Sequence, residues 1–179
     1  DPAPGWVTLR FSPDGQWLYA DYRWDGRRDA AAVWEFRDGK LGRKIDLEHF
    51  CVFSPDSRLI AGAKPDGSIG VYELASGRQI KHFGKGKGVS NVLFQPAGRE
   101  LAAILRPDRR TIAVFDLETE KEIVPRLVHD QPVVDVAWSG DGRLLAAASE
   151  DQRIYVYDRV QSRLQSVLEG HCALGNIIK

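Results

Sequence analysis

Short apolar stretches and polar turns alternate along the whole chain, and the same arrangement returns four times. In each unit an apolar stretch ends in an aromatic residue, a polar turn follows, and a second apolar stretch rich in alanine comes next. The aromatic residue and its turn read FSPDG from Phe11, FSPDS from Phe53, FQPAG from Phe94 and WSGDG from Trp138. A unit that recurs at a period in the low forties predicts a chain built from repeated structural modules.

The turn after each aromatic residue has the side chains that a tight turn needs. In the first unit, Pro13 presets the backbone of the second turn position and Gly15 suits the fourth position. A strand is therefore expected before each turn and another strand after it. The strands before the turns are predicted at 6–11, 50–53, 89–94 and 133–138. The strands after the turns are predicted to begin at residues 17, 58, 100 and 143.

A third stretch in every unit contains a valine, an aromatic residue and an acidic residue, in that order. These stretches read AVWEF at 32–36, GVYEL at 70–74, AVFDL at 113–117 and YVYDR at 155–159. Apolar residues occupy both alternation phases there, which indicates strands that are covered on both faces. A fourth strand is predicted near 45–47, 79–83, 122–128 and 164–168. No segment keeps a helical apolar period between caps, so no helix is expected.

Each unit is therefore predicted to be a four-stranded antiparallel sheet with two apolar faces. Small sheets of this kind bury both faces by packing around a common axis, so the predicted fold is an all-β propeller with four blades of four strands. The blades are expected near 5–48, 49–84, 85–128 and 129–170, with 171–179 as the start of a fifth blade.

An unclosed row of blades leaves an apolar face bare at each end, which is costly in water. The four blades are therefore expected to form part of a seven- or eight-bladed ring. The alternatives are two copies paired into one eight-bladed ring and, least favoured, a self-sufficient ring of four blades. The chain begins at Asp1 and contains no methionine, so we expect either that a signal peptide has been removed or that the sequence is a piece of a longer protein, and the second fits the repeat argument.

The chain resembles the WD-repeat β-propeller family over essentially its whole length. The acid after the aromatic residue of the third stretch matches the second letter of the family's Trp-Asp pair in Trp34-Glu35, Tyr72-Glu73, Phe115-Asp116 and Tyr157-Asp158. The resemblance also implies a structural hydrogen-bond set, which the fourth unit matches best with His129, Ser149, Asp151 and Tyr157. Proteins of this family assemble complexes or sense signals for an attached effector, so the resemblance implies an interaction role.

Charge and cysteine content narrow the functional classes. The 25 basic and 25 acidic residues balance, so no overall field recruits nucleic acid or anionic lipid. No apolar run approaches the roughly 20 residues that span a bilayer. Cys51 and Cys172 are too far apart in the sequence to indicate a zinc site or a disulfide framework, and this usage favours a cytoplasmic location. Neither a cofactor nor a metal is expected.

The sequence offers no catalytic set that outweighs a structural interpretation. His129, Asp151 and Ser149 have the residue types of a hydrolytic triad, but buried polar groups in a blade need partners, and this favours the structural role. The run GKGKG at 84–88 lacks the spacing and the following helix of a phosphate-binding loop. We therefore predict no catalytic, cofactor-binding or metal-ligating residue.

One surface carries a candidate binding function. In a propeller, the connections from the second to the third strand and from one blade to the next open onto the same end. The connection from the second to the third strand is longest in the first unit and is also lengthened in the third. A tryptophan among arginines has the composition of a binding hot spot. The candidate partner-binding face comprises Arg23, Trp24, Arg27, Arg28, Lys64, Lys85, Lys87, Arg106, Arg109 and Arg110.

The predicted function is a non-enzymatic protein–protein interaction scaffold that presents loops on one propeller face to a protein or peptide. It could serve as the sensor or interaction part of a larger multidomain protein. One alternative is an enzyme with a site in the propeller channel, for which the polar candidates on the innermost strands are Thr8, Arg10, Ser90, Asn91 and Asp135. Another is a nucleic-acid clamp through the basic loops, which the zero net charge disfavours.

Overall fold

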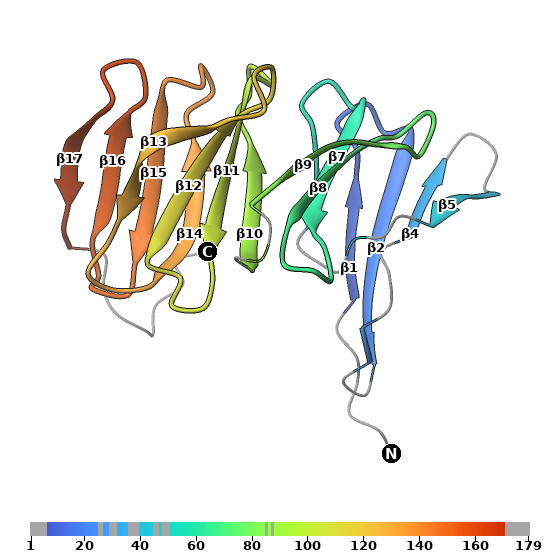
Figure 1. Cartoon of the computed structure of the whole chain (residues 1–179), viewed down its shortest axis with the longest axis horizontal. Helices are drawn as coiled ribbons and strands as arrows, with labels where there is room; N and C mark the ends of the chain where they lie inside the picture. The colour runs from blue at the N-terminus through green and yellow to red at the C-terminus, as the bar shows by residue number, and fades with distance from the viewer. Residues whose placement is uncertain are drawn as a thin grey trace.

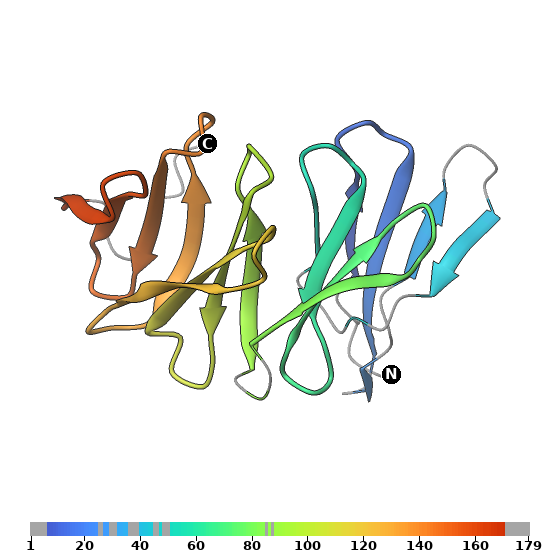
Figure 2. The ribbon, with the colours of Figure 1, turned by 45° about the horizontal axis from the view of Figure 1, so that its top comes forward.

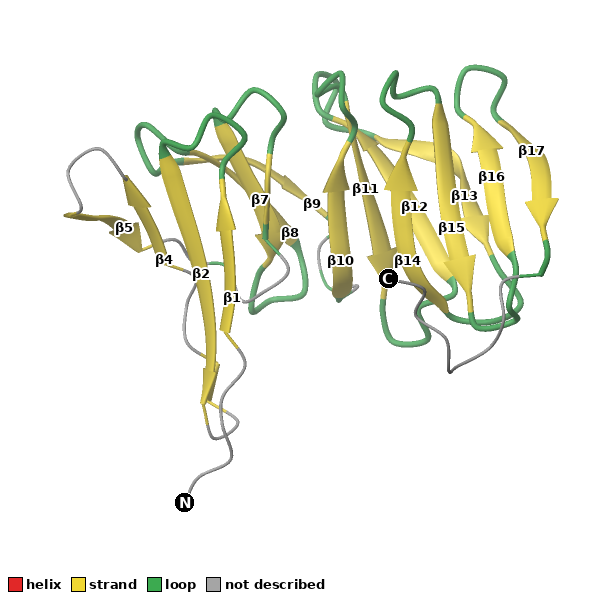
Figure 3. Ribbon diagram, turned by 180° about the vertical axis from the view of Figure 1, so that it is seen from behind, coloured by secondary structure: helices red, strands yellow, loops and turns green. Residues whose placement is uncertain are grey.

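The structure is a computed structural model that describes residues 7–24, 27–28, 32–35, 40–44, 47, 51–84, 86 and 88–170. Regular structure within these ranges consists of strands alone, and they contain no helix (Figure 3). No helix in the described part is therefore long and apolar enough to cross a membrane. The all-β prediction is confirmed.

The strands form four antiparallel sheets, each built from consecutive strands. The first sheet contains β1 (Val7–Phe11), β2 (Trp17–Trp24), β4 (Ala32–Glu35) and β5 (Lys40–Lys44), with the short β3 (Arg27–Arg28) paired to β2. The second contains β6 (Val52–Phe53), β7 (Leu59–Ala63), β8 (Ile69–Glu73) and β9 (Gln79–Phe83). The third contains β10 (Val89–Phe94), β11 (Glu100–Leu105), β12 (Thr111–Asp116) and β13 (Glu122–Val128). The fourth contains β14 (Val133–Trp138), β15 (Leu144–Ser149), β16 (Ile154–Asp158) and β17 (Arg163–Leu168).

The fourth strand of the first sheet differs from its prediction. It was expected at 45–47, but the structure places β5 at Lys40–Lys44. The apolar residue that drew the prediction, Leu47, is buried in the core between the first and second sheets, outside any strand. Its burial serves the junction between sheets. The proposed start of a fifth blade, 171–179, lies outside the described residues.

The four sheets stand side by side in chain order, with their faces toward one another (Figures 1 and 2). The first strand of the third sheet, β10, contacts β6 and β7 of the second sheet and β14 of the fourth. The first strands therefore lie along the inner side of the row, and the fourth strands lie along its outer side. This is the arrangement of blades in a β-propeller.

Three separate apolar cores fill the three junctions between sheets. On β11, Leu101 and Ala103 belong to the core shared with the second sheet, whereas Ala102 and Ile104 belong to the core shared with the fourth sheet. Successive side chains of a strand point to opposite faces, so one strand serves both cores. This confirms the prediction that both alternation phases are apolar because both faces are covered. Cys51 is buried at the first junction, as expected of a small hydrophobic residue.

The outer faces of the first and fourth sheets remain apolar but uncovered. On β1, Leu9 is 63% exposed and Phe11 is 55% exposed. On the fourth sheet, Leu168 is about half exposed. Single exposed apolar residues are ordinary, but sheet faces of this composition resemble the faces that the inner junctions bury.

The tight turns between the first and second strands contain the predicted chemistry. Ser12 donates its hydroxyl proton to Asp14 at 2.6 Å and accepts a bond from the Trp17 N–H at 3.0 Å. The fourth position has a left-handed backbone, with a φ of 71° at Gly15 and 57° at Ser57. Glycine adopts that conformation without cost, whereas serine does not.

Ser57 is explained by a contact across the first junction. Its hydroxyl oxygen accepts a hydrogen bond from the backbone N–H of Asp14 at 3.0 Å, which joins the turns of the first and second sheets. The turns of the third and fourth sheets are joined differently, because the Gln95 side-chain amide donates to the carbonyl oxygen of Gly142 at 2.8 Å. Each of these two junctions therefore has its own polar link.

Candidate functional site

The end of the sheets opposite these turns, named here the loop end, carries the candidate face. It is formed by the β7–β8, β11–β12 and β15–β16 turns and by the β9–β10 and β13–β14 connections, which lie along the lower edge in Figure 1. Strand β2 extends beyond the other strands in the same direction. The two kinds of connection therefore open onto one end, as the propeller arrangement requires.

The three described turns between second and third strands share one five-residue geometry. In each, an aspartate at the third position accepts a bond from the N–H of the fifth residue, at 2.9 to 3.0 Å for Asp66, Asp108 and Asp151. The fourth position is left-handed, with φ values of 77° at Gly67 and 58° at Arg109. A non-glycine residue there costs roughly 1–2 kcal/mol. The third sheet accepts this cost and presents an arginine.

Backbone hydrogen bonds tie these turns to the connections beside them. The Gly88 N–H donates to the Gly67 carbonyl at 2.9 Å, and the Arg106 N–H donates to the Gly88 carbonyl at 3.0 Å. On the other side of the third sheet, the Val133 N–H donates to the Arg109 carbonyl at 2.8 Å. The β11–β12 turn is thus held from both sides by neighbouring backbone.

In both lengthened units, part of the connection is strand among the described residues. In the third unit, the pair Leu105 and Thr111 extends β11 and β12 by one residue each, and the turn keeps its five residues. In the first unit, β2 continues as a two-stranded ribbon with β3, in which Trp24 pairs with Arg27. The sequence Asp25-Gly26 between them is the dipeptide typical of the shortest hairpins and could have signalled the ribbon.

The predicted face residues are spread along the loop end. The ribbon places the backbones of Arg23, Trp24, Arg27 and Arg28, whose side chains lie outside the described part. Lys85 and Lys87 lie outside the described residues altogether. The β7–β8 turn contains Lys64, whose ammonium group donates to Gln79 at 2.9 Å. The β11–β12 turn contains Arg106, Arg109 and Arg110, all exposed.

A hollow of about 640 Å³ opens between the third and fourth sheets beside the β11–β12 turn. Its wall brings together two predicted face residues, two polar residues of the inner strand β10, and four apolar residues that the sequence analysis did not assign to the site. They are Arg106 and Arg109, Ser90 and Asn91, and Ile104, Pro107, Val133 and Val134. Arg110 belongs to the same turn but does not line the hollow.

Register irregularities help to form this hollow. The pairing of β10 with β11 shifts between Val89 and Asn91, and that of β14 with β15 shifts between Val133 and Asp135. A bulge of this kind turns the side chain of the extra residue. Val134 is 51% exposed although its neighbour Val133 is fully buried. The extra residue, Ser90 in β10 and Val134 in β14, therefore occupies the corresponding position of both inner strands.

The structural hydrogen-bond set of the fourth sheet is present in a rearranged form. The Nε2 atom of His129 lies 3.3 Å from the hydroxyl oxygen of Tyr157. Asp151 accepts a bond from the Tyr155 hydroxyl at 2.6 Å, and the Ser149 hydroxyl accepts one from the Asp151 N–H at 3.4 Å. His129 also contacts the edges of both tyrosine rings. The set joins strands within one blade and lies away from the hollow's lining.

Burial determines the charge state of this set. Burial lowers the pKa of His129, and the nearby carboxylates of Asp151 and Asp130 offset only part of that effect. Burial, with a smaller contribution from Tyr155, raises the pKa of Tyr157 to about 12. Both groups are therefore neutral at pH 7, which suits a buried structural role because neither places a charge in the blade interior.

Acidification is expected to destabilise the fold through His129. Because its folded-state pKa is below the ordinary 6.5, the stability present above about pH 6.5 is lost as the pH falls below that value. The lowered pKa values of the aspartates act only at lower pH. Urea unfolding at about pH 7.5 and about pH 5.5 should show a loss for the parent and a much smaller loss for His129→Gln. The control His82→Gln, on exposed β9, should keep the parent's loss, and an equal loss in all three proteins would contradict the assignment.

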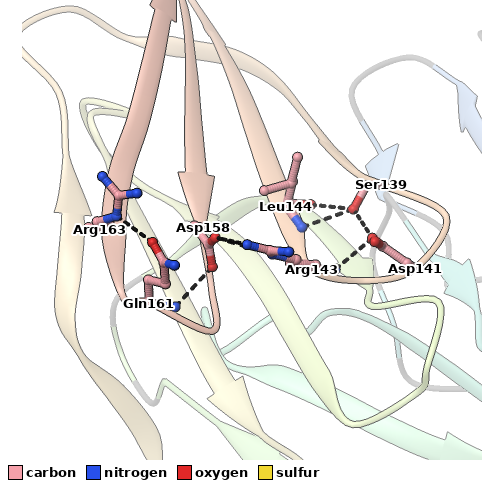
Figure 4. Close-up of polar contacts among 7 residues, drawn as sticks. All are labelled: Ser139, Asp141, Arg143, Leu144, Asp158, Gln161 and Arg163. Atoms are coloured by element: carbon pink, nitrogen blue, oxygen red, sulfur yellow. Dashed lines mark hydrogen bonds and ion pairs between the residues drawn. The ribbon is translucent and has the colours of Figure 1, made fainter.

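In the third and fourth sheets, the acid after the aromatic residue of the third strand has a structural role that the sequence analysis did not assign. Asp158 is almost fully buried at the end of β16. It accepts a bond from the Gln161 N–H at 2.9 Å and two from the Arg143 guanidinium at 2.9 and 3.2 Å (Figure 4). These bonds hold its pKa below the ordinary value. Asp116 accepts bonds from two N–H groups of its own turn in the same way. The repeated acid closes the turn to the fourth strand.

Comparison with known proteins agrees with this repeat. Residues 122–158 match the family described as WD domain, G-beta repeat. The matched segment runs from β13 through β16, so one sequence repeat spans the last strand of one blade and the first three strands of the next. WD repeat-containing protein SL1-17 from Schistosoma mansoni is 32% identical over 138 residues, which cover 74% of this chain and 44% of the relative. The chain belongs to the WD-repeat family.

Two other relatives of the WD-repeat chain are named for roles in chromatin assembly and nuclear distribution. The chromatin assembly factor 1 subunit FAS2 homolog from Oryza sativa subsp. japonica is 30% identical over 135 residues, covering 66% of this chain and 26% of the relative. The nuclear distribution protein nudF from Aspergillus terreus is 28% identical over 167 residues, which cover 77% of this chain and 36% of the relative. The WD-repeat chain thus spans less than half the length of these three relatives. Among its described residues, no group of three or more His, Cys, Asp or Glu side chains is placed to hold a metal ion.

Proposed function

We propose that this WD-repeat chain is a non-enzymatic scaffold that presents the loop end to a protein or peptide partner. The observation that carries the proposal is the set of backbone hydrogen bonds that joins the turns and connections of neighbouring blades there. These bonds fix the turns before a partner arrives, so binding does not need to order them. Exposed arginines on such turns are suited to contact a partner.

The names of the relatives support an assembly role. One is named as a subunit of a chromatin assembly factor, and another as a nuclear distribution protein. Both are similar to this chain in sequence, although their own partners are not carried over to it. The proposal includes a cytoplasmic location, for which the support is the absence of a cysteine framework in the sequence.

The proposal also includes a ring that other blades complete. The uncovered faces of the first and fourth sheets contain apolar residues such as Phe11 and Leu168. Burial of such surface stabilises a protein by roughly 25 cal/mol per Å². Further blades of the same ring, seven or eight in all, would cover both faces as the inner junctions do. A second copy of this chain is the alternative, and light scattering distinguishes the two.

Loss of the β2–β3 ribbon side chains is expected to abolish partner capture. Replacing Trp24 and Arg27 together by alanine in the intact protein removes an aromatic anchor and its neighbouring charge, and hot-spot residues of these types cost about 2 kcal/mol or more when truncated. Affinity purification followed by mass spectrometry should therefore lose specific partners, while the unfolding midpoint stays near that of the parent.

The matched control replaces one apolar residue and one arginine at the end of the sheets opposite the loop end. Replacing Val160 and Arg163 by alanine alters exposed positions of the β16–β17 turn region and should leave the captured partners unchanged. The loop-end proposal is wrong if the Trp24 and Arg27 variant folds normally and captures the same partners as the parent.

A further inference from the structure

We propose that the hollow beside the β11–β12 turn binds an extended peptide segment through an anionic side chain, either a carboxylate or a phosphate. The inference rests on the proposed scaffold function and specifies the ligand chemistry of one position on the loop end. Two arginines, two polar side chains and an apolar wall meet in this hollow, whose volume of about 640 Å³ falls in the range of ligand-binding clefts.

Arg106 and Arg109 provide the charge complementarity. Both are exposed, and both line the hollow from the same turn. A guanidinium group offers a planar fork of donors that matches the two oxygens of a carboxylate or a phosphate. Two such groups on one turn favour an anionic partner over a neutral or a cationic one.

The turn that carries these arginines is fixed in advance. The Arg106 N–H is bonded to the Gly88 carbonyl, and the Arg109 carbonyl accepts a bond from the Val133 N–H. Arg109 has a left-handed backbone with a φ of 58°, at the position that Gly67 occupies in the second sheet. The corresponding residue of the fourth sheet, Gln152, has a φ of 67°, so two of the three turns present a side chain from this position.

The existing partner of Arg109 leaves the arginine available. Arg109 forms an ion pair with Glu150 at 2.9 Å, and both side chains are 45% exposed. An ion pair this exposed to water contributes about 0–1 kcal/mol. An incoming anion can therefore replace Glu150, and Glu150 competes with it.

The remaining wall indicates what flanks the anionic residue. Val134 and Pro107 are exposed apolar residues of the wall, and Ile104 is a buried one. Ser90 and Asn91 are half-buried polar residues on the opposite strand, and the Ser90 hydroxyl donates to the Ile104 carbonyl at 3.3 Å. The Asn91 amide can bond a peptide backbone. The geometry favours an apolar residue next to the anionic one.

The test begins with a displayed library of random peptides of about nine residues, selected on the intact protein. The selected peptides should be enriched in aspartate or glutamate next to apolar residues. Each is then synthesised with its acidic residue kept, replaced by glutamine, or replaced by phosphoserine. Binding is measured by fluorescence anisotropy. The glutamine forms should bind at least about tenfold more weakly, and the ratio of the acidic to the phosphoserine form identifies the source of the negative charge.

Matched variants locate the binding site. Arg106→Ala and Arg109→Gly should each weaken binding by about tenfold or more. Glycine is chosen at 109 because it suits the left-handed backbone and preserves the turn. Arg110→Ala removes the same charge from the same turn outside the hollow and should have little effect. Glu150→Gln removes the competitor and should tighten binding about two- to fivefold.

Three results would overturn the inference. They are selected peptides without acidic enrichment, binding that is indifferent to both arginine variants in folded protein, and preferential binding of a mixed oligonucleotide with the same arginine dependence. If partner capture still depends on Trp24 and Arg27 in any of these cases, the scaffold function stands and only the hollow's assignment fails.

Discussion

Replacing Leu101 by alanine is expected to lower the free energy of unfolding by about 2–5 kcal/mol. Leu101 is fully buried on β11 and packs in the core between the second and third blades. Its removal leaves a cavity that two sheets, each also packed on its other face, cannot readily close. Urea unfolding followed by tryptophan fluorescence measures the change.

The control for this variant is an exposed apolar residue. Val160 is 77% exposed in the turn between β16 and β17, so Val160→Ala should change the unfolding free energy by no more than about 0.5 kcal/mol. A Leu101→Ala protein as stable as the Val160→Ala protein would show that the junction between the second and third blades is not closely packed.

Replacing Gly67 by alanine should destabilise the protein by about 2–3 kcal/mol, the sum of a left-handed backbone penalty and a lost hydrogen bond. Gly67 has a φ of 77°, and a methyl group there would lie 2.9 Å from the backbone nitrogen of Gly88. The neighbouring connection would have to move, which would break the bond between the Gly88 N–H and the Gly67 carbonyl. Thermal unfolding and amide exchange at Gly88 report the two effects.

Gly98 separates backbone conformation from close approach. Its φ is 74°, but a methyl group there would meet nothing within 4 Å. Gly98→Ala should therefore cost only the conformational part, about 1–2 kcal/mol. If the two variants are equally destabilised, the close approach of the β7–β8 turn to the β9–β10 connection has no energetic weight.

The repeat and its strands were predictable because they depend on local chemistry and alternation. The turn of Ser12 and Asp14 forms the bonds that its residue types favour, and the two apolar phases around Leu101 and Ala102 predicted burial on both faces. Both signals are carried within a few consecutive residues. They require no knowledge of which sheet lies beside which.

The first blade was predicted less well because its outer strand lacks an apolar pattern. Sequence KLGRK forms β5, whereas the apolar Leu47 that resembled a strand residue is buried at the junction with the next blade. The ribbon of β2 and β3 was likewise interpreted as a loop. Three of the four paired residues are arginines, so an apolar alternation gives no signal there.

The hollow could be predicted only in part. Charge and position predict Arg106 and Arg109, but two of the four apolar wall residues, Val133 and Val134, come from another blade. Val133 and Val134 are adjacent in the sequence, but Val133 is buried and Val134 is exposed at a shift in the pairing of β14 with β15. Such irregularities arise from the pairing of whole strands, which short sequence patterns do not record.

The turn links between neighbouring blades have a consequence for the order of the repeats. Ser57 accepts a bond from Asp14 across one junction, and Gln95 reaches Gly142 across another. The counterpart is a backbone group in both cases, so each link depends on one side chain alone. The later turn supplies that side chain at the first junction and the earlier turn supplies it at the third, so a module moved to another place in the row would take its linking side chain to a different junction.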